Sequence, residues 1–524
     1  MKQHKSGRNP NPDKYISIKE PGILILGLLL SVLSAAICMQ IMGQFGTTPN
    51  TSLIGVALVM VVARLPLAAA QRFRDTQRQN YVLSIASSAG FTAANCGFVA
   101  IATMMVLGRS DLVVPVTIGA LVGSVITVYT TGKIFDSKIF PVDGAWPMGK
   151  AVATTIEAGD EGGKKGWQLF QGMLVGGVAG ALGIPAAGVG IAFIANAFTM
   201  AALGVGMVLR GYSAVLFNGF DIGTSNIAQG VMIGAGIVAL AQITKAIVKG
   251  SKKVTDSQRH VVSDGAFIKA IGGFAGLFMG GAVLIGVLTS SFAYMTLMQS
   301  VMWIVIAGLM AVMVLILVGT ASMHSGWAPT FAVVTICLTF GVMIGVPPLP
   351  LAVLVGYLGS VGPCFSDTGI GLKTGWLIRG QGKDPQHEAF GRKQQVWIKQ
   401  IGVLIGIGVA IISAQVLIEG NIIPPMSFFY ASTVYMTAEP TLLRELALWA
   451  IPGAILQLIF GTKSVGLMLA AGLLINNGLY GIVVLVSIGL RLIIGTKHMT
   501  IRGPGLIAGD GLFGFGANLF RAFF

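Results

Sequence analysis

Long apolar runs separated by short polar gaps fill the chain from residue 21 onward. A run of about 20 apolar residues is long enough to cross the hydrocarbon of a membrane as a helix. The pattern predicts spans near residues 21–43, 51–71, 81–107, 112–132, 167–184, 186–209, 224–248, 266–288, 299–320, 327–346, 398–418, 443–460, 464–495 and 503–523. Shorter apolar pieces at 140–158 and 350–378 are expected to be half-helices. We therefore expect an all-α polytopic membrane protein with about 14–16 transmembrane or half-membrane helices.

One stretch, from Ser325 to Arg379, combines apolar runs with residues that disfavour a regular membrane helix. It contains four prolines: Pro347, Pro348, Pro350 and Pro363. Backbone groups freed by proline are tolerated in hydrocarbon only where they face protein or a water-filled cavity. We therefore expect broken helices here, with Asp367 beside such a cavity. Unwound segments that carry an ionisable group are typical of the binding sites of secondary transporters.

Composition and charge agree with a membrane protein. Hydrophobic residues make up 54% of the 524 residues and charged residues 10%, with a net charge of +15. The basic residues cluster in the gaps between apolar runs, which is the positive-inside pattern and not the basic face of a nucleic-acid-binding protein. Residues 1–20 form a basic tail that we expect to be cytoplasmic. The gaps interpreted as cytoplasmic hold Arg72/Arg74/Arg78, Lys164/Lys165, Lys249/Lys252/Lys253 and Lys383/Arg392/Lys393.

No motif predicts catalysis or a cofactor. The four cysteines lie in apolar stretches without metal-ligand spacing, and no H-E-x-x-H or G-x-S-x-G motif is present. Gly144 to Lys150 spells the G-x-x-x-x-G-K of a nucleotide-binding loop, but Ala151 replaces the Ser/Thr that holds Mg²⁺. The sequence thus predicts neither an enzyme nor a metal or cofactor site.

Similar segments recur along the chain and predict two related halves, residues 21–260 and 261–524. The matching segments surround Trp167 and Trp397, 230 residues apart, Ile268 and Ile501, 233 apart, and Pro49 and Pro329, 280 apart. Transporters built from such pseudo-symmetric halves bind their substrate at the interface between them.

Three segments resemble blocks of the oligopeptide transporter family, which includes the yellow stripe-like branch. They are Phe365–Gln395 with its L-K-T-G sequence, Trp146–Gly159 and the glycine-rich Gly503–Phe515. The resemblance, to a prokaryotic-type member, implies a helical carrier with duplicated halves that moves peptides or metal chelates with protons. The chain departs from the family block at Gly371, where the family has a second aspartate, and at Trp376, where it has tyrosine.

The two blocks supply the first candidates for substrate or proton binding. Asp367 is either such a site or a helix-capping carboxylate. Lys373 either contacts substrate or extends to the membrane interface. In the first-half block, Asp143 and Lys150 flank a helix start whose free N–H groups suit an anionic substrate group, and Glu157 is a further carboxylate.

Two other polar clusters are candidates for substrate binding, and each also has a purely structural interpretation. His324, Ser325 and Trp327 lie at the start of a predicted span, where a structural histidine is the alternative. Asp221 and Asn226 lie in a glycine-rich segment between the basic residues Arg210 and Lys245. The spacing of these two basic residues does not fit one simple membrane crossing. Either residues 211–223 re-enter the membrane or the span count is off by one there. The alternative is that these residues are polar only because they lie in a loop at the membrane interface.

These observations favour a secondary active transporter of small peptides, peptide-like compounds or metal chelates, coupled to protons and embedded in a membrane, which we expect to be the bacterial inner membrane. The expected partners are that substrate, protons and the lipid bilayer, with no nucleic acid. The alternative is another class of ion-coupled carrier, or a channel, for a small anionic solute.

Overall fold

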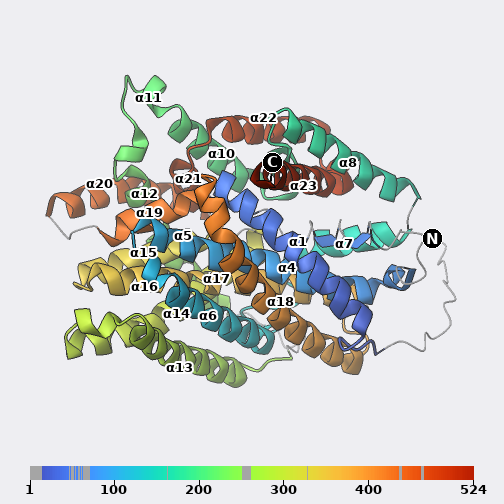
Figure 1. The fold of residues 1–524 in the computed structure, drawn as a ribbon, viewed down its shortest axis with the longest axis horizontal. Helices are drawn as coiled ribbons and strands as arrows, with labels where there is room; N and C mark the ends of the chain where they lie inside the picture. The colour runs from blue at the N-terminus through green and yellow to red at the C-terminus, as the bar shows by residue number, and fades with distance from the viewer. Residues whose placement is uncertain are drawn as a thin grey trace.

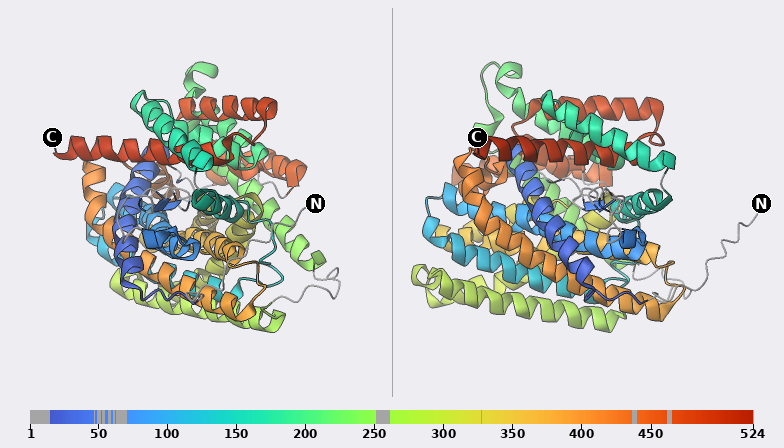
Figure 2. Two further views of the ribbon diagram at one scale, coloured as in Figure 1. Left: turned by 90° about the vertical axis from the view of Figure 1, so that its right-hand side faces the viewer. Right: turned by 45° about the vertical axis from the view of Figure 1, so that its right-hand side comes forward.

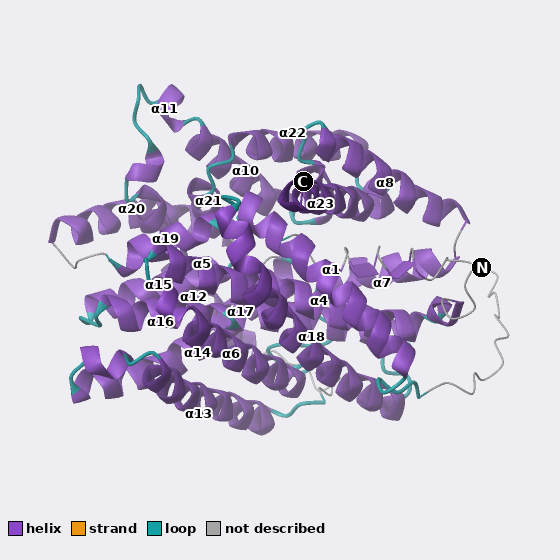
Figure 3. Ribbon diagram, viewed as in Figure 1, coloured by secondary structure: helices purple, strands orange, loops and turns teal. Residues whose placement is uncertain are grey.

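The computed structural model describes residues 15–46, 71–161, 163–250, 261–326, 328–435, 440–461 and 465–523, with a few single positions between 48 and 62. Helices and their connections make up all of these residues, and none of them lies in a strand (Figure 3). Seven helices or helix runs in these ranges are long and apolar enough to cross a membrane. The predicted all-α polytopic architecture is confirmed.

The first half of the chain contains long helices as well as short ones (Figure 1). They are α1 (Pro21–Phe45), α4 (Thr76–Phe91), the π-helix η2 (Thr92–Phe98), α5 (Val99–Val106), α6 (Val113–Ile134), α7 (Pro147–Glu161), α8 (Gly163–Ala181), α9 (Ala186–Ile194), α10 (Ala197–Gly211), α11 (Ser213–Leu216) and α12 (Ile227–Gly250). Short 3₁₀ helices at Arg72–Arg74, Ser110–Leu112 and Ile222–Thr224 lie between them. The predicted span at 51–71 falls largely outside the described residues.

The second half begins with α13 and contains a further 3₁₀ helix at Ser291–Tyr294. Its α-helices are α13 (Asp264–Leu288), α14 (Leu297–Ser325), α15 (Thr330–Met343), α16 (Pro348–Gly359), α17 (Val361–Ile378), α18 (Pro385–Glu419), α19 (Pro425–Val434), α20 (Pro440–Phe460), α21 (Val465–Leu474), α22 (Gly478–Ile494) and α23 (Met499–Phe523). In the three-dimensional arrangement, α8, α10, α22 and α23 gather on one side of the bundle and α13 runs along the opposite edge (Figures 1 and 2).

The predicted break beside Asp367 is wrong, although breaks occur elsewhere. The chain leaves the helical conformation before Pro347, and Pro348 opens α16 in a position that needs no N–H donor. Pro363 falls in the first turn of α17 for the same reason, so α17 continues as a regular helix through Asp367. Only Ser360 separates α16 from α17, and Asp367 lies well inside α17, which also rules out a capping role.

Two predicted continuous spans, 186–209 and 464–495, are instead broken in the same way. The first divides into α9 and α10 and the second into α21 and α22. Asn196 caps α10 by accepting from the N–H groups of Phe198 and Thr199, and Asn477 caps α22 by accepting from the N–H of Tyr480. An asparagine that accepts such bonds satisfies N–H groups that a helix start leaves free.

Local geometry recurs at an offset of about 280 residues. The two capping asparagines, Asn196 and Asn477, are 477 − 196 = 281 residues apart. Gly46 and Gly326, the left-handed residues that end α1 and α14, are 326 − 46 = 280 apart. This offset agrees with that of the Pro49/Pro329 pair in the sequence and differs from the 230-residue offset of the Trp167/Trp397 pair. The extents of the two halves remain a prediction.

Glycine contacts join helices that are far apart in the sequence, backbone to backbone. A Cβ added at Gly172 of α8 would strike the backbone of α23, and one added at Gly505 of α23 would strike α8. The same reciprocal contact occurs between α10 and α21 and between α12 and α20. Small residues that let backbones approach are typical of helix packing in membranes.

Candidate functional site

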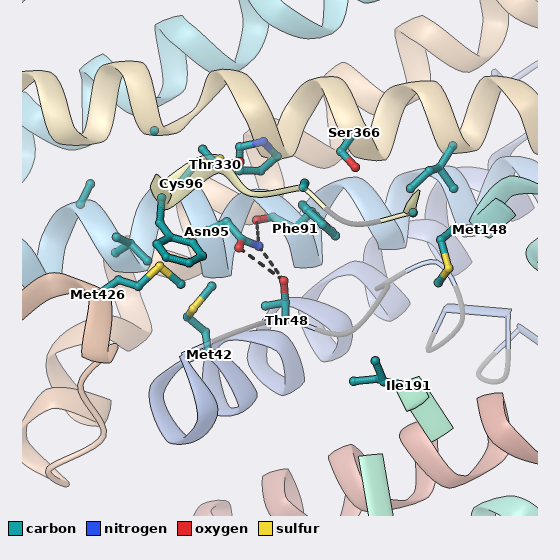
Figure 4. Close-up of a pocket in the computed structure, with 18 of the residues that line it drawn as sticks. Met42, Thr48, Phe91, Asn95, Cys96, Met148, Ile191, Thr330, Ser366 and Met426 are labelled. Carbon is teal, nitrogen blue, oxygen red and sulfur yellow. Dashed lines mark hydrogen bonds between the residues drawn. The ribbon is translucent and has the colours of Figure 1, made fainter. Parts of the chain in front are cut away.

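A cavity lies between two long, buried helix runs. The first run is α4–η2–α5, residues 76–106, and the second is α16–α17, residues 348–378. The segments that follow α1 and α14, together with α19, line other sides of the cavity (Figure 4). Its volume of about 90 Å³ is well below the ~300 Å³ at which pockets for drug-sized ligands begin. The cavity is therefore too small in this structure for a ligand of that size.

The cavity lining is mainly apolar, with a few polar groups at its centre. Asn95 of the π-helix η2 donates to Thr48 Oγ1 over 3.0 Å and to the carbonyl of Phe91 over 3.1 Å (Figure 4). Ser366 and Thr330 also line the cavity, from α17 and α15. A π-helical turn carries one extra residue, which changes the direction of its side chains, and such turns are frequent at functional sites. The π-helix η2 therefore explains how Asn95 comes to face the cavity. Such a lining suits an organic molecule with a few hydrogen-bonding groups.

A buried ion pair lies next to this cavity. Lys399 Nζ of α18 donates to Asp367 Oδ2 of α17 over 2.6 Å and to Ser87 Oγ of α4 over 3.3 Å. Both charged side chains are almost completely buried, with 3% of Asp367 and none of Lys399 exposed. The second carboxylate oxygen of Asp367 is buried and has no hydrogen-bond partner in the described structure. The preceding residue, Ser366, lines the cavity and shares a 2.5 Å hydrogen bond with Ser322 of α14.

Gly371 lies beside this pair, at the position where the family block has its second aspartate. A Cβ added at Gly371 would lie 2.5 Å from Lys399 Cε and 3.1 Å from its Nζ. Gln395, one turn before Lys399 on α18, donates over 2.7 Å to the Gly371 carbonyl and accepts over 2.9 Å from Arg379. The glycine thus leaves the space in which the Lys399 side chain crosses to Asp367.

The structure places the other block candidates together but outside the cavity lining. Lys373 of α17 is buried, donates to the Val142 carbonyl over 2.7 Å and lies over the Trp376 ring. It is within electrostatic range of Lys150 and Asp143, which are both exposed. The Lys373 side chain is therefore held between α17 and the segment that leads into α7. A hydrogen bond from Thr374 to the Gly149 carbonyl also joins the two resembling blocks.

Glu157 and the Asp221–Asn226 segment do not line the cavity either. Glu157 is an exposed residue of α7. Asp221 accepts from the Gly223 N–H over 2.9 Å and pairs with Arg210. The Gly223 amide and the Arg210 guanidinium hold the pKa of Asp221 below its ordinary value. Asn226 donates to Glu445 over 2.9 Å.

The cluster at His324 to Trp327 is described only in part. His324 and Ser325 end α14, and their side chains and all of Trp327 lie outside the described residues. Gly326, between them, lines the cavity.

Sequence reasoning missed Lys399 and Asn95. Lys399 lies at the second position of the predicted span 398–418, where a lysine is usually interpreted as reaching for the interface. Asn95 lies inside a run that was interpreted as a simple span. The available signal was the cost of placing an ionisable or amide side chain within hydrocarbon, which by itself marks a functional candidate. Among the described residues, no three His, Cys, Asp or Glu side chains form a group able to hold a metal ion.

Comparison with known proteins agrees with the resemblance of the sequence blocks. Residues 22–243 match the family model described as OPT oligopeptide transporter protein. This match includes the helix run α4–η2–α5 and the block around Lys150. No curated protein matches the chain.

Proposed function

Starting from the membership of residues 22–243 in the oligopeptide transporter family, we propose that the chain is a proton-coupled carrier in which the Asp367–Lys399 pair takes up the proton. The family implies transport of oligopeptides or peptide-like compounds across a membrane. The observation that carries the finer proposal is the buried ion pair on α17, the helix whose Ser366 lines the cavity.

A proton on Asp367 neutralises the carboxylate of the buried ion pair. The partnerless Oδ1 of Asp367 is the oxygen that accepts it, because Oδ2 is engaged by Lys399. Once the carboxylate is neutral, the Lys399 ammonium remains buried without a counter-ion, which is costly in an apolar interior. Movement of α17 or α18 that gives Lys399 a new partner relieves this cost, and α17 carries the cavity wall with it. The proton is thereby linked to the shape of the substrate cavity.

We expect the substrate to be a small peptide, a peptide-like compound or a metal chelate, bound when the cavity is wider than in this structure. Asn95 and Ser366 offer hydrogen bonds to amide groups, and the surrounding Met42, Met148 and Met426 form an adaptable apolar surface (Figure 4). Lys373 and Lys150 are the nearby cations that a widened cavity would offer to a carboxylate. We place the membrane of residence at the bacterial inner membrane with the N-terminal tail in the cytoplasm, as the basic gaps predict.

Uptake into proteoliposomes tests the proposal. Labelled tripeptides and ferric chelates are offered with an inward proton gradient, with the gradient collapsed, and with Na⁺ removed. We expect uptake to follow the proton gradient and Asp367→Asn to reduce gradient-driven uptake strongly while exchange without net proton movement persists in part. Asp221→Asn is the matched control, since Asp221 is an ion-paired carboxylate outside the cavity. Uptake that survives collapse of the proton gradient but stops without Na⁺ contradicts the proposal.

A further inference from the structure

A large concavity on the outer surface of the bundle combines an apolar lining with basic residues at one end. It lies between α6, α13 and α18 and has a volume of about 1110 Å³. Val125 and Leu404 are among the apolar residues that line it, and Lys133, Arg392 and Lys393 are its basic residues. We call this concavity the basic groove. It shares no lining residue with the cavity that contains Asn95.

We propose that the basic groove binds an anionic phospholipid, with the phosphate at Lys133 and Lys393 and an acyl chain along α6 and α18. The helices that form it, α6, α13 and α18, are all candidate membrane spans, and α13 lies at the edge of the bundle (Figures 1 and 2). A groove between membrane helices is open to lipid along its length. Basic pockets of this kind between transmembrane helices are suited to anionic lipid headgroups.

The charges in the groove favour an anion. Glu388 and Asp136 also line it, and both pair with Arg392, at 3.6 and 3.9 Å, while Glu388 binds Arg379 with both oxygens, at 2.7 and 3.0 Å. The basic side chains that the groove presents to an anion are therefore Lys133 and Lys393. Lys393 and Lys133 are exposed. Lys133 lies 4.4 Å from the centre of the Tyr129 ring, a contact that leaves its ammonium hydrogens available to a phosphate.

The dimensions of the groove agree with one leaflet of a bilayer. Lys393 and Leu404 are 404 − 393 = 11 residues apart on α18, which corresponds to about 16 Å of helix. Half of the hydrocarbon core of a bilayer is about 15 Å thick. Trp397 and Tyr129, 58% and 47% exposed, flank the basic end, as aromatic residues do at the headgroup level of membranes. The groove therefore presents, in order, a charged, an aromatic and an apolar zone.

Native mass spectrometry of the full chain released from nanodiscs tests the proposal. Nanodiscs of equimolar phosphatidylglycerol and phosphatidylcholine are compared for wild type and for the double variant Lys133→Gln/Lys393→Gln. We expect wild type to retain phosphatidylglycerol selectively. The affinity of the double variant for phosphatidylglycerol should be roughly 25-fold lower, since each basic side chain near an anionic surface contributes about fivefold. Lys269→Gln/Lys497→Gln, which removes two exposed lysines outside the groove, is the control and should retain the lipid.

A second measurement separates a lipid from a simple anion. Glycerol phosphate, which has the headgroup chemistry without acyl chains, should not displace the retained lipid at millimolar concentration. Displacement by glycerol phosphate would show that the groove binds only the phosphate. Equal retention of the two lipids by wild type, or undiminished phosphatidylglycerol in the double variant, would overturn the proposal. Both lysines are exposed, so the double variant is expected to fold.

Discussion

Removing either member of the Asp367–Lys399 pair should destabilise the protein more than removing both. The two side chains are almost fully buried and their charged atoms lie 2.6 Å apart. Removing one partner of a buried pair leaves an uncompensated charge, at a cost of about 3–5 kcal/mol. Lys399→Gln leaves Asp367 with neither oxygen bonded to a cation, and Asp367→Asn leaves the Lys399 ammonium with neutral acceptors and no counter-ion. We expect Asp367→Asn/Lys399→Gln to recover most of the summed loss of the two single variants, and in any case more than the cost of either one.

The measurement is equilibrium unfolding of the four proteins in mixed micelles, followed by uptake into proteoliposomes. The unfolding data give the coupling free energy between the two residues as a double-mutant cycle. The double variant should be nearly as stable as wild type but should not take up substrate in response to a proton gradient. Such a result would separate the structural role of the pair from its role in coupling.

Two results would refute this reasoning. If each single variant lost less than about 1 kcal/mol and the losses added, the two charges would not be energetically linked. If the stable double variant still took up substrate with protons, the proton would bind elsewhere, at Asp143 or Glu157 for example. A matched control is Arg109→Gln, which breaks an exposed pair with Asp111 and should cost little.

Three further outcomes follow from the contacts of other residues. Asn95→Ala should weaken substrate binding by roughly fivefold, from about 1 kcal/mol for one hydrogen bond, and unchanged affinity in an equilibrium binding assay would place the substrate away from the π-helix η2. Lys373→Ala and Lys150→Ala should each weaken binding of a carboxylate-bearing substrate by about 1 kcal/mol or more, whereas unchanged affinity in both would mean that they serve packing and solvation only. The pKa of Asp221 is lowered in the folded protein, so the stability that its bonds contribute is fully present above its ordinary pKa of 3.8. That stability is lost as the pH falls through the lower pKa of the folded protein. Amide exchange in residues 212–226 should therefore accelerate relative to α18 below about pH 4. Exchange that stays slow there at low pH would show that the Arg210 pair does not hold the loop.

The sequence was sufficient for the architecture because hydrocarbon imposes a simple pattern. Runs of apolar residues predicted α1, α6, α13 and α14 within a few residues of their observed bounds. Prolines predicted an interruption near Pro347 for a local reason, since the missing N–H acts on the chain at that residue. Pro363 misled because the same residue is harmless in the first turn of a helix, and only the structure shows where α17 begins.

The candidate site could be predicted only in part because its partners meet through tertiary packing. Asp367 was identifiable as an ionisable residue between apolar runs. Its partner Lys399 lies 399 − 367 = 32 residues away on another helix, and no local spacing connects the two. Asn95 faces the cavity from a π-helix, whose extra residue turns side chains away from the directions that a regular helical period predicts.

The glycine contacts between α8 and α23, α10 and α21, and α12 and α20 bear on which parts can move during transport. Each pair takes one helix from either half of the sequence, and the two backbones touch without intervening side chains. Helices packed in this way lack the side-chain layer that allows packed helices to slide by small rotamer changes. We therefore predict that the two helices of each pair move together during transport. A cross-link within any of these pairs should then leave turnover intact, whereas one between α17 and α8 should arrest it.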